Sequence, residues 1–96
     1  MTKLDKFQCQ HHAKKLREYA KSYLADGLRR WQGEAEMISM VRGDAKDFRE
    51  VAKLLRAGKV KEAFSRADSM DTAPREQIPD DVWNAMHYHV YPQENY

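Results

Sequence analysis

Apolar residues recur with a helical period through the first half of the chain. From Gln8 to Val41, at about 100° per residue, they fall on one face, which only Glu34 interrupts. That face consists of Cys9, His12, Ala13, Leu16, Tyr19, Ala20, Tyr23, Gly27, Trp31, Ile38 and Val41. The pattern predicts a helix over residues 7–42, either one long helix or two nearly coaxial helices. A break near Gly33 fits the second form, because glycine costs about 1 kcal/mol inside a helix.

A helical hairpin is predicted next, from helices over residues 44–57 and 59–69. Asp44 is a good N-cap, and Asp47 adds a carboxylate in the first turn, where the helix dipole favours it. Apolar residues then recur at helical spacing: Phe48, Val51, Ala52, Leu55, Val60, Ala63, Phe64 and Ala67. Gly58 suits the position just past a helix end. The short turn there predicts that the two helices run antiparallel.

The last third of the chain predicts a loop and a final helix. Residues 70–78 are read as loop, and residues 79–91 as a C-terminal helix with Pro79 at its first position. The run 86–91 also alternates like a strand, but helix is preferred because no partner strand is visible. Residues 92–96 are expected to be a frayed tail.

These elements predict an all-α protein with a single domain spanning residues 1–96. The long N-terminal helix is expected to pack with the hairpin and the C-terminal helix. The predicted core side chains are Leu16, Tyr23, Trp31, Phe48, Leu55 and Phe64. Gly27 lies on the apolar face, where a missing side chain would let another helix approach closely.

The net charge of +2 hides an uneven distribution of charged residues. Residues 1–33 hold eight bases and three acids, whereas residues 67–96 hold one base and six acids. Such asymmetry bears on association rather than on fold. The acidic end either folds back to neutralise the helices or leaves their basic surface free for a partner.

Features of the sequence also favour a cytoplasmic protein. Cys9 is the only cysteine, so no intramolecular disulfide can form and a reducing compartment is the simpler interpretation. No stretch approaches the roughly 20 apolar residues of a membrane helix, and the N-terminus lacks the apolar segment of a signal peptide. We therefore expect no membrane partner.

Candidate chemistry is weak along the whole chain. Cys9, His11 and His12, with His87 and His89, invite a zinc hypothesis, but structural zinc takes four ligands in paired spacings that are absent here. No nucleophile–base pair with an orienting group, and no glycine-rich phosphate loop, is present. We expect no enzyme activity, no cofactor and no metal.

Two basic stripes carry the stronger signal. Helical spacing aligns three bases in the first helix and four in the second, and Glu50 lies off the second stripe. The two stripes are Lys14, Arg17 and Lys21, and Lys46, Arg49, Lys53 and Arg56. Such stripes are solvated in many proteins, and otherwise suit phosphates or an acidic protein surface. No helix-turn-helix, RNA-recognition or zinc-finger pattern accompanies them.

Other residues favour a protein partner. Leu28 points toward the basic side of the first helix, where an isolated monomer gains nothing from it. Tyr88, Tyr91 and Tyr96 stand beside acids, a composition suited to binding hot spots. If exposed, the peptide bonds before Pro74 and Pro79 would also suit a prolyl isomerase.

The sequence thus predicts a small non-enzymatic module that docks on a larger protein and modulates it, most simply by inhibition. In size and composition it resembles the small accessory proteins by which bacteria and phages modulate host enzymes. A target among DNA-processing enzymes would suit the basic stripes. The alternative is a protein that binds nucleic acid directly through its basic helix faces.

Overall fold

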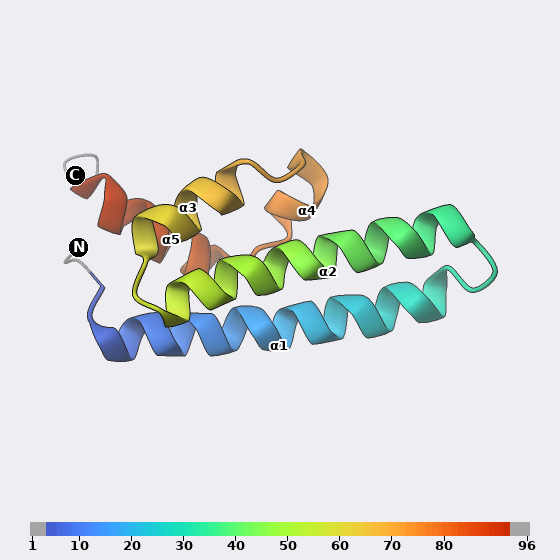
Figure 1. Cartoon of the computed structure of the whole chain (residues 1–96), viewed down its shortest axis with the longest axis horizontal. Coiled ribbons are helices and arrows are strands. Elements are labelled where there is room, and N and C mark those ends of the chain that lie inside the picture. Colours follow the sequence, from blue (N-terminus) through green and yellow to red (C-terminus); the bar gives the residue numbers. More distant parts are fainter. Residues whose placement is uncertain (1–3, 93–96) are drawn as a thin grey trace.

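The computed structural model describes residues 4–92, which form five helices and no strand. The helices are α1 (Lys6–Arg30), α2 (Ala35–Arg56), α3 (Val60–Asp68), α4 (Thr72–Glu76) and α5 (Asp80–Val90). Helices α1 and α2 lie side by side and antiparallel along the molecule, and α3 and α5 pack together beside one end of this pair, with α4 in the connection between them (Figure 1). The predicted all-α fold is confirmed.

Helix α1 begins at a capping box. Asp5 accepts a hydrogen bond from the backbone amide of Gln8 at 2.8 Å, and the Gln8 side chain accepts one from the amide of Asp5 at 2.9 Å. These two bonds satisfy amides that the first helical turn leaves without partners. From there the helix buries Cys9, Ala13, Leu16 and Ala20, all members of the predicted apolar face.

The predicted break near Gly33 is confirmed, but the two helices on either side of it are antiparallel, so the prediction that residues 7–42 form one long helix or two coaxial helices is wrong. The chain reverses at residues 31–34, where Gly33 has a φ of 81°, a left-handed conformation that glycine adopts without strain. The apolar residues Trp31, at the start of this reversal, and Ile38, after it, lie seven positions apart in the sequence, which is close to two turns at about 100° per residue. The apolar phase therefore continues across the turn as if the helix were unbroken.

The predicted helix boundary at Gly43-Asp44 is also wrong, because α2 passes through both residues. Asp44 does not cap a helix; its Oδ2 accepts a hydrogen bond from the Tyr23 hydroxyl at 2.8 Å, which links α2 to α1. Asp47 is not in a first turn either and forms an ion pair with Arg66 of α3. Both carboxylates thus serve tertiary contacts.

Gly27 sets the spacing between α1 and α2. A Cβ atom on this residue would come within 2.8 Å of Val41 Cγ2 and closer still to Cγ1. The side chain of Val41 is 6% exposed and, being β-branched, has little rotamer freedom with which to move aside. The close approach expected of Gly27 is confirmed, with α2 as the neighbouring helix.

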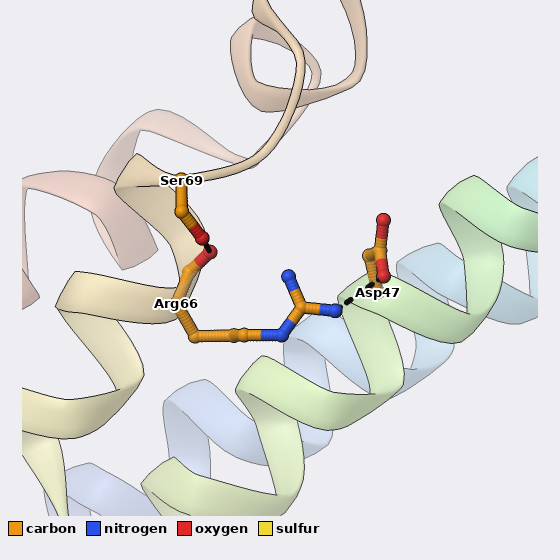
Figure 2. A network of polar contacts seen from close by, with 3 residues as sticks. All are labelled: Asp47, Arg66 and Ser69. Atoms are coloured by element: carbon orange, nitrogen blue, oxygen red, sulfur yellow. Dashed lines mark hydrogen bonds and ion pairs between the residues drawn. The ribbon is translucent and has the colours of Figure 1, made fainter.

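Helix α3 folds back along α2 after a turn at Gly58, whose φ is 80°. The predicted hairpin turn is therefore correct, although its first helix begins at Ala35 instead of residue 44. Figure 2 shows the side chain of Arg66 reaching from α3 to Asp47 on α2, while Ser69 Oγ donates a hydrogen bond to the Arg66 carbonyl at 2.8 Å.

The segment predicted as a loop over residues 70–78 contains α4, a helix of five residues that is too short to show a period. Pro79 was predicted at the first position of the last helix; it is instead the N-cap, so α5 begins one residue later, at Asp80. The run 86–91 continues α5 as far as Val90 and forms no strand. The predicted frayed tail lies outside the described residues, except for Pro92.

Helix α5 is held against α1 by polar contacts at several levels. Lys15 Nζ lies 2.5 Å from Asp81 Oδ2, and His89 Nδ1 accepts a hydrogen bond from the backbone amide of Leu4 at 2.9 Å. Just before α5, Gln77 Oε1 accepts a hydrogen bond from the Tyr19 hydroxyl at 3.1 Å. The acidic end therefore folds back on α1.

Most of the predicted core is confirmed. Leu16, Phe48 and Leu55 are fully buried in one continuous cluster, and Phe64 is 8% exposed at its edge. Tyr23 and Trp31 are only half-buried. Tyr23 packs at the edge of the core, with its ring centroid 5.2 Å from that of Phe48.

The hydrogen bond between Tyr23 and Asp44 predicts an unusual titration. Burial and the Asp44 carboxylate raise the pKa of Tyr23 to about 12. Because the folded pKa exceeds the ordinary value of 10.0, the resulting stabilisation is complete below that pH and is lost as pH rises toward the folded pKa. We expect phenolate absorbance to show Tyr23 as a late-titrating tyrosine, which Asp44→Asn shifts to lower pH and Asp47→Asn leaves in place. Identical curves for Asp44→Asn and the wild type would contradict this contact.

Candidate interaction surface

All seven bases of the two predicted stripes are exposed. In α2, Ala45, Phe48, Ala52 and Leu55 are among the buried residues, and each is followed directly by one base: Lys46, Arg49, Lys53 and Arg56. In α1, the buried residues Cys9, Ala13, Leu16 and Ala20 are followed by Gln10, Lys14, Arg17 and Lys21. Each stripe therefore flanks the buried stripe of its own helix.

The opposite flank of each helix is occupied. In α2 the position before Phe48 is Asp47, which pairs with Arg66 of α3. In α1 the position before Leu16 is Lys15, which pairs with Asp81 of α5. Helices α3 and α5 therefore cover one side of the α1–α2 pair, and the basic stripes lie on the other side.

The antiparallel course of α1 and α2 brings the two stripes together. When two antiparallel helices are viewed along one axis, successive residues go clockwise around one helix and anticlockwise around the other. The flank that follows the buried stripe therefore lies on the same side of the pair in both helices. A shallow hollow of about 270 Å³ between the helices confirms this, since Lys14, Arg17 and Arg56 line it together with Gln10 and Ala13. We call the seven bases on this side the basic face.

The basic face is not neutralised within residues 4–92. None of its seven bases takes part in an ion pair there, although four other bases do. The acidic end reaches Lys15, on the covered flank, and its Asp68 pairs with Arg75 nearby in the chain. The expectation that the tail might neutralise the helices therefore holds at Lys15, whereas no acid within residues 67–92 pairs with the basic face.

Leu28 extends the basic face toward the turn between α1 and α2. It lies seven positions after Lys21 and so on the same side of α1, as does Leu24, seven positions after Arg17. Both leucines are half-buried. One side of the α1–α2 pair thus carries a basic region that continues into a partly exposed apolar region.

Of the predicted tyrosines, Tyr91 belongs to a different surface. Tyr91 packs edge-on against Phe64, with ring centroids 5.9 Å apart, and its ring lies 5.3 Å from that of His87. The Tyr88 ring lies 5.8 Å from the His87 ring. The contact between Tyr91 and Phe64 joins the end of α5 to α3, on the covered side of α1–α2, so this tyrosine does not extend the basic face. Tyr96 lies outside the described residues.

The two prolines differ from the exposed sites that a prolyl isomerase would need. Pro74 is buried in α4, and Pro79 is half-buried at the start of α5. The burial of Pro74 argues against that hypothesis at the bond before it.

Within residues 4–92, no three His, Cys, Asp or Glu side chains gather as a metal site would require. Burial raises the pKa of the Cys9 thiol, with a smaller contribution from Asp5, which disfavours the thiolate that binds zinc. Burial also lowers the pKa of His12, whose Nδ1 is buried without a hydrogen-bond partner in the described part of the chain. His89 uses its Nδ1 to hold the start of α1.

The sequence did not reveal two features of this surface. Gln10 lines the hollow because it lies four positions before Lys14, on the same flank of α1. The spacing is visible in the sequence, but Gln10 carries no charge that would have identified it as part of the basic stripe. Arg17 and Arg56 line the same hollow only because the chain reverses at residues 31–34. The apolar period did not predict this reversal.

Comparisons with protein-family models, with curated proteins and with solved structures found no match to this chain. None of the helices described for residues 4–92 has both the length and the apolar character needed to cross a bilayer.

Proposed function

We propose that this chain is a non-enzymatic module that docks through its basic face on an acidic surface of a larger protein and thereby modulates that protein, most simply by inhibiting it. One observation carries the proposal: seven exposed bases share the uncovered side of α1–α2, and none of them pairs with a carboxylate within residues 4–92. Such a surface attracts and orients an acidic partner.

Leu24 and Leu28 favour a protein over a nucleic acid as the partner. They continue the basic face as a half-buried apolar region. A protein surface can cover these side chains with apolar groups of its own, whereas the phosphate backbone of a duplex offers none. Inhibition follows where docking blocks or distorts the partner's working site, as in modulators that phages direct at host DNA-processing enzymes.

We further propose a cytoplasmic location for this docking. The single cysteine, Cys9, is buried and forms no disulfide. A partner in a reducing compartment is consistent with a fold that needs no disulfide.

Direct binding of nucleic acid is the second candidate, and the hollow between α1 and α2 favours it. Arg17 and Arg56 both line this hollow, with Lys14 beside them and no carboxylate in its lining. Guanidinium groups bind phosphate oxygens in a bidentate manner, so two arginines and a lysine suit a backbone phosphate.

Capture and salt titration distinguish the two candidates. With the purified protein as bait at physiological salt, we expect retention of one stoichiometric large protein from a bacterial lysate, weakened as salt increases. We expect poor binding of duplex and single-stranded DNA or RNA under the same conditions. The opposite result would be tight nucleic-acid binding whose log affinity falls, for each tenfold increase in salt, by about 0.7–0.9 of a unit per phosphate neutralised. Together with an empty capture, that result would contradict the first candidate and establish the second.

A further inference from the structure

The hollow between α1 and α2 brings three bases of the basic face to one place. Lys14 and Arg17 line it from α1, and Arg56 lines it from the last turn of α2. Gln10 adds a side-chain amide that can donate hydrogen bonds. No carboxylate of residues 4–92 is in its lining. Three positive charges without a negative one favour an anion as the ligand of this hollow.

The hollow has room for an anion of several atoms and offers little to an apolar group. Its volume of about 270 Å³ is several times the space that one water molecule requires. Its only apolar lining residue is Ala13, which is 1% exposed. No aromatic or branched apolar side chain lines it. A partner can therefore fill the hollow favourably with a charged group and not with an apolar anchor.

The end of α2 does not oppose an anion here. The last carbonyls of a helix carry partial negative charge when they lack hydrogen-bond donors. In this chain residues 57–59 donate backbone hydrogen bonds of 2.9–3.1 Å to the carbonyls of Lys53, Leu54 and Leu55. Arg56 adds a full positive charge at the same helix end. The end of α2 therefore contributes a guanidinium group, while carbonyls that would repel an anion are already occupied.

The acids closest to the hollow do not neutralise it. Glu18 lines a separate hollow on the far side of Lys14. Asp5 lines another hollow beside Arg56, and its Oδ1 accepts a hydrogen bond from the backbone amide of Gln8. Neither acid forms an ion pair with a lining base within residues 4–92. The three lining bases are therefore available to an external anion.

Charge and geometry favour a phosphate monoester among the anionic groups that a partner can supply. A carboxylate or a phosphodiester brings one negative charge, whereas a phosphorylated side chain brings about 1.5–2 near neutral pH, with three strong acceptor oxygens. Two guanidinium groups and one ammonium group can supply a donor to each of these three oxygens. Arginine clusters are a recurrent means of recognising phosphorylated segments. The monoester therefore balances the charge of the hollow more fully than the other two groups.

We infer that this hollow receives a phosphorylated side chain of the protein partner, with the phosphate held by Lys14, Arg17 and Arg56. The inference rests on the proposed docking and adds the chemical group by which the partner is recognised. The remaining bases of the basic face then meet carboxylates around the phosphate. Phosphorylation of the partner thereby controls docking, because removal of the phosphate leaves three bases without a counter-charge.

Methyl phosphate tests the hollow without any partner, since it is a monoester with no second charged group. We expect a titration into the isotopically labelled full chain to produce saturable shifts in the side-chain NMR signals of Arg17 and Arg56. Dimethyl phosphate and acetate, each with one charge, should bind at least about tenfold more weakly at equal ionic strength. Equal affinities for methyl phosphate and dimethyl phosphate would contradict recognition of a monoester.

Two arginine variants locate the binding. Arg56→Gln removes one guanidinium group from the hollow and should weaken methyl phosphate binding by about tenfold, the effect of one charge-assisted hydrogen bond. Arg42→Gln makes the same change in charge at an exposed residue on the same side of α2. Arg42 lies fourteen positions earlier, about 21 Å along the helix, so binding should remain unchanged. Equal weakening by the two substitutions would show that methyl phosphate responds only to net charge.

Phosphatase treatment of the lysate before capture tests the source of the phosphate. We expect the treated lysate to lose the captured protein that the untreated lysate retains. Capture that survives the treatment would overturn the inference and leave docking through the basic face in place. Tighter binding of an oligonucleotide bearing a terminal phosphate, with capture unaffected by phosphatase, would assign the hollow to nucleic acid. An empty capture from the untreated lysate would instead contradict the docking itself.

Discussion

Leu16→Ala is expected to lower the free energy of unfolding by about 2–5 kcal/mol. Leu16 is completely buried, with 0% of its surface accessible to solvent, and it belongs to the central cluster with Phe48 and Leu55. Removing its branched methyl groups forfeits their burial and leaves a cavity that the surrounding helices fill only in part. Urea unfolding followed by circular dichroism measures the change through the midpoint, provided that the slope stays constant.

Leu28→Ala supplies the matched control on the same helix. The substitution is chemically identical, but Leu28 is half-buried and lies on the uncovered side of α1. We expect it to cost less than half as much as Leu16→Ala, because part of its surface already contacts water. Equal losses at the two positions would show that the helical phase assigned to α1 is wrong.

Gly27→Ala is expected to destabilise the protein by about 1–3 kcal/mol, although alanine is the better helix former. The added methyl group would overlap the side chain of Val41, so α1 and α2 must separate or Val41 must leave its rotamer. Thermal or urea unfolding monitored by circular dichroism reports the loss. The effect measures how closely the two long helices approach.

Gly43→Ala is the control with the opposite sign. Gly43 lies inside α2, and a Cβ atom there would meet nothing within 4 Å. We therefore expect a gain in stability of about 1 kcal/mol from helix propensity alone. In addition, Val41→Ala should relieve the overlap, so Gly27→Ala should cost less in that background than in the wild type. Stabilisation by both glycine substitutions would contradict the close packing at Gly27.

The sequence predicted the elements whose signals are local. The apolar residues of α1, including Cys9 and Leu16, define its buried face, and Gly58 marks the turn into α3. Pro79 marks the start of α5. These features depend on spacing and on single-residue conformations, which can be read without knowing the partners of each helix.

The elements that the sequence did not predict depend on tertiary contacts. The turn at residues 31–34 preserves the apolar phase, so period alone cannot distinguish a straight helix from a hairpin. Asp44 resembles an N-cap, but its carboxylate is used by Tyr23 from a distant part of α1. Helix α4 buries Pro74, but it lies in a segment too short to carry a periodic signal.

The interaction surface shows the same division. Each basic stripe was visible in the sequence, because helical spacing aligns bases such as Arg49 and Lys53. Their union into one face was not, because it requires α1 and α2 to lie antiparallel. The separation of the basic face from Tyr91 likewise follows from the packing of α5 on α3.

Capture with two charge-matched double variants tests the proposed docking most directly. Arg49→Glu with Lys53→Glu reverses the centre of the basic face, and Lys59→Glu with Lys61→Glu makes the same change in net charge at exposed bases beside the start of α3. Exposed charges contribute little to folding, so both proteins should melt near the wild-type temperature. We expect the first variant to lose the captured partner and the second to retain it at physiological salt. Equal retention by the two variants, or equal loss, would contradict docking through the basic face.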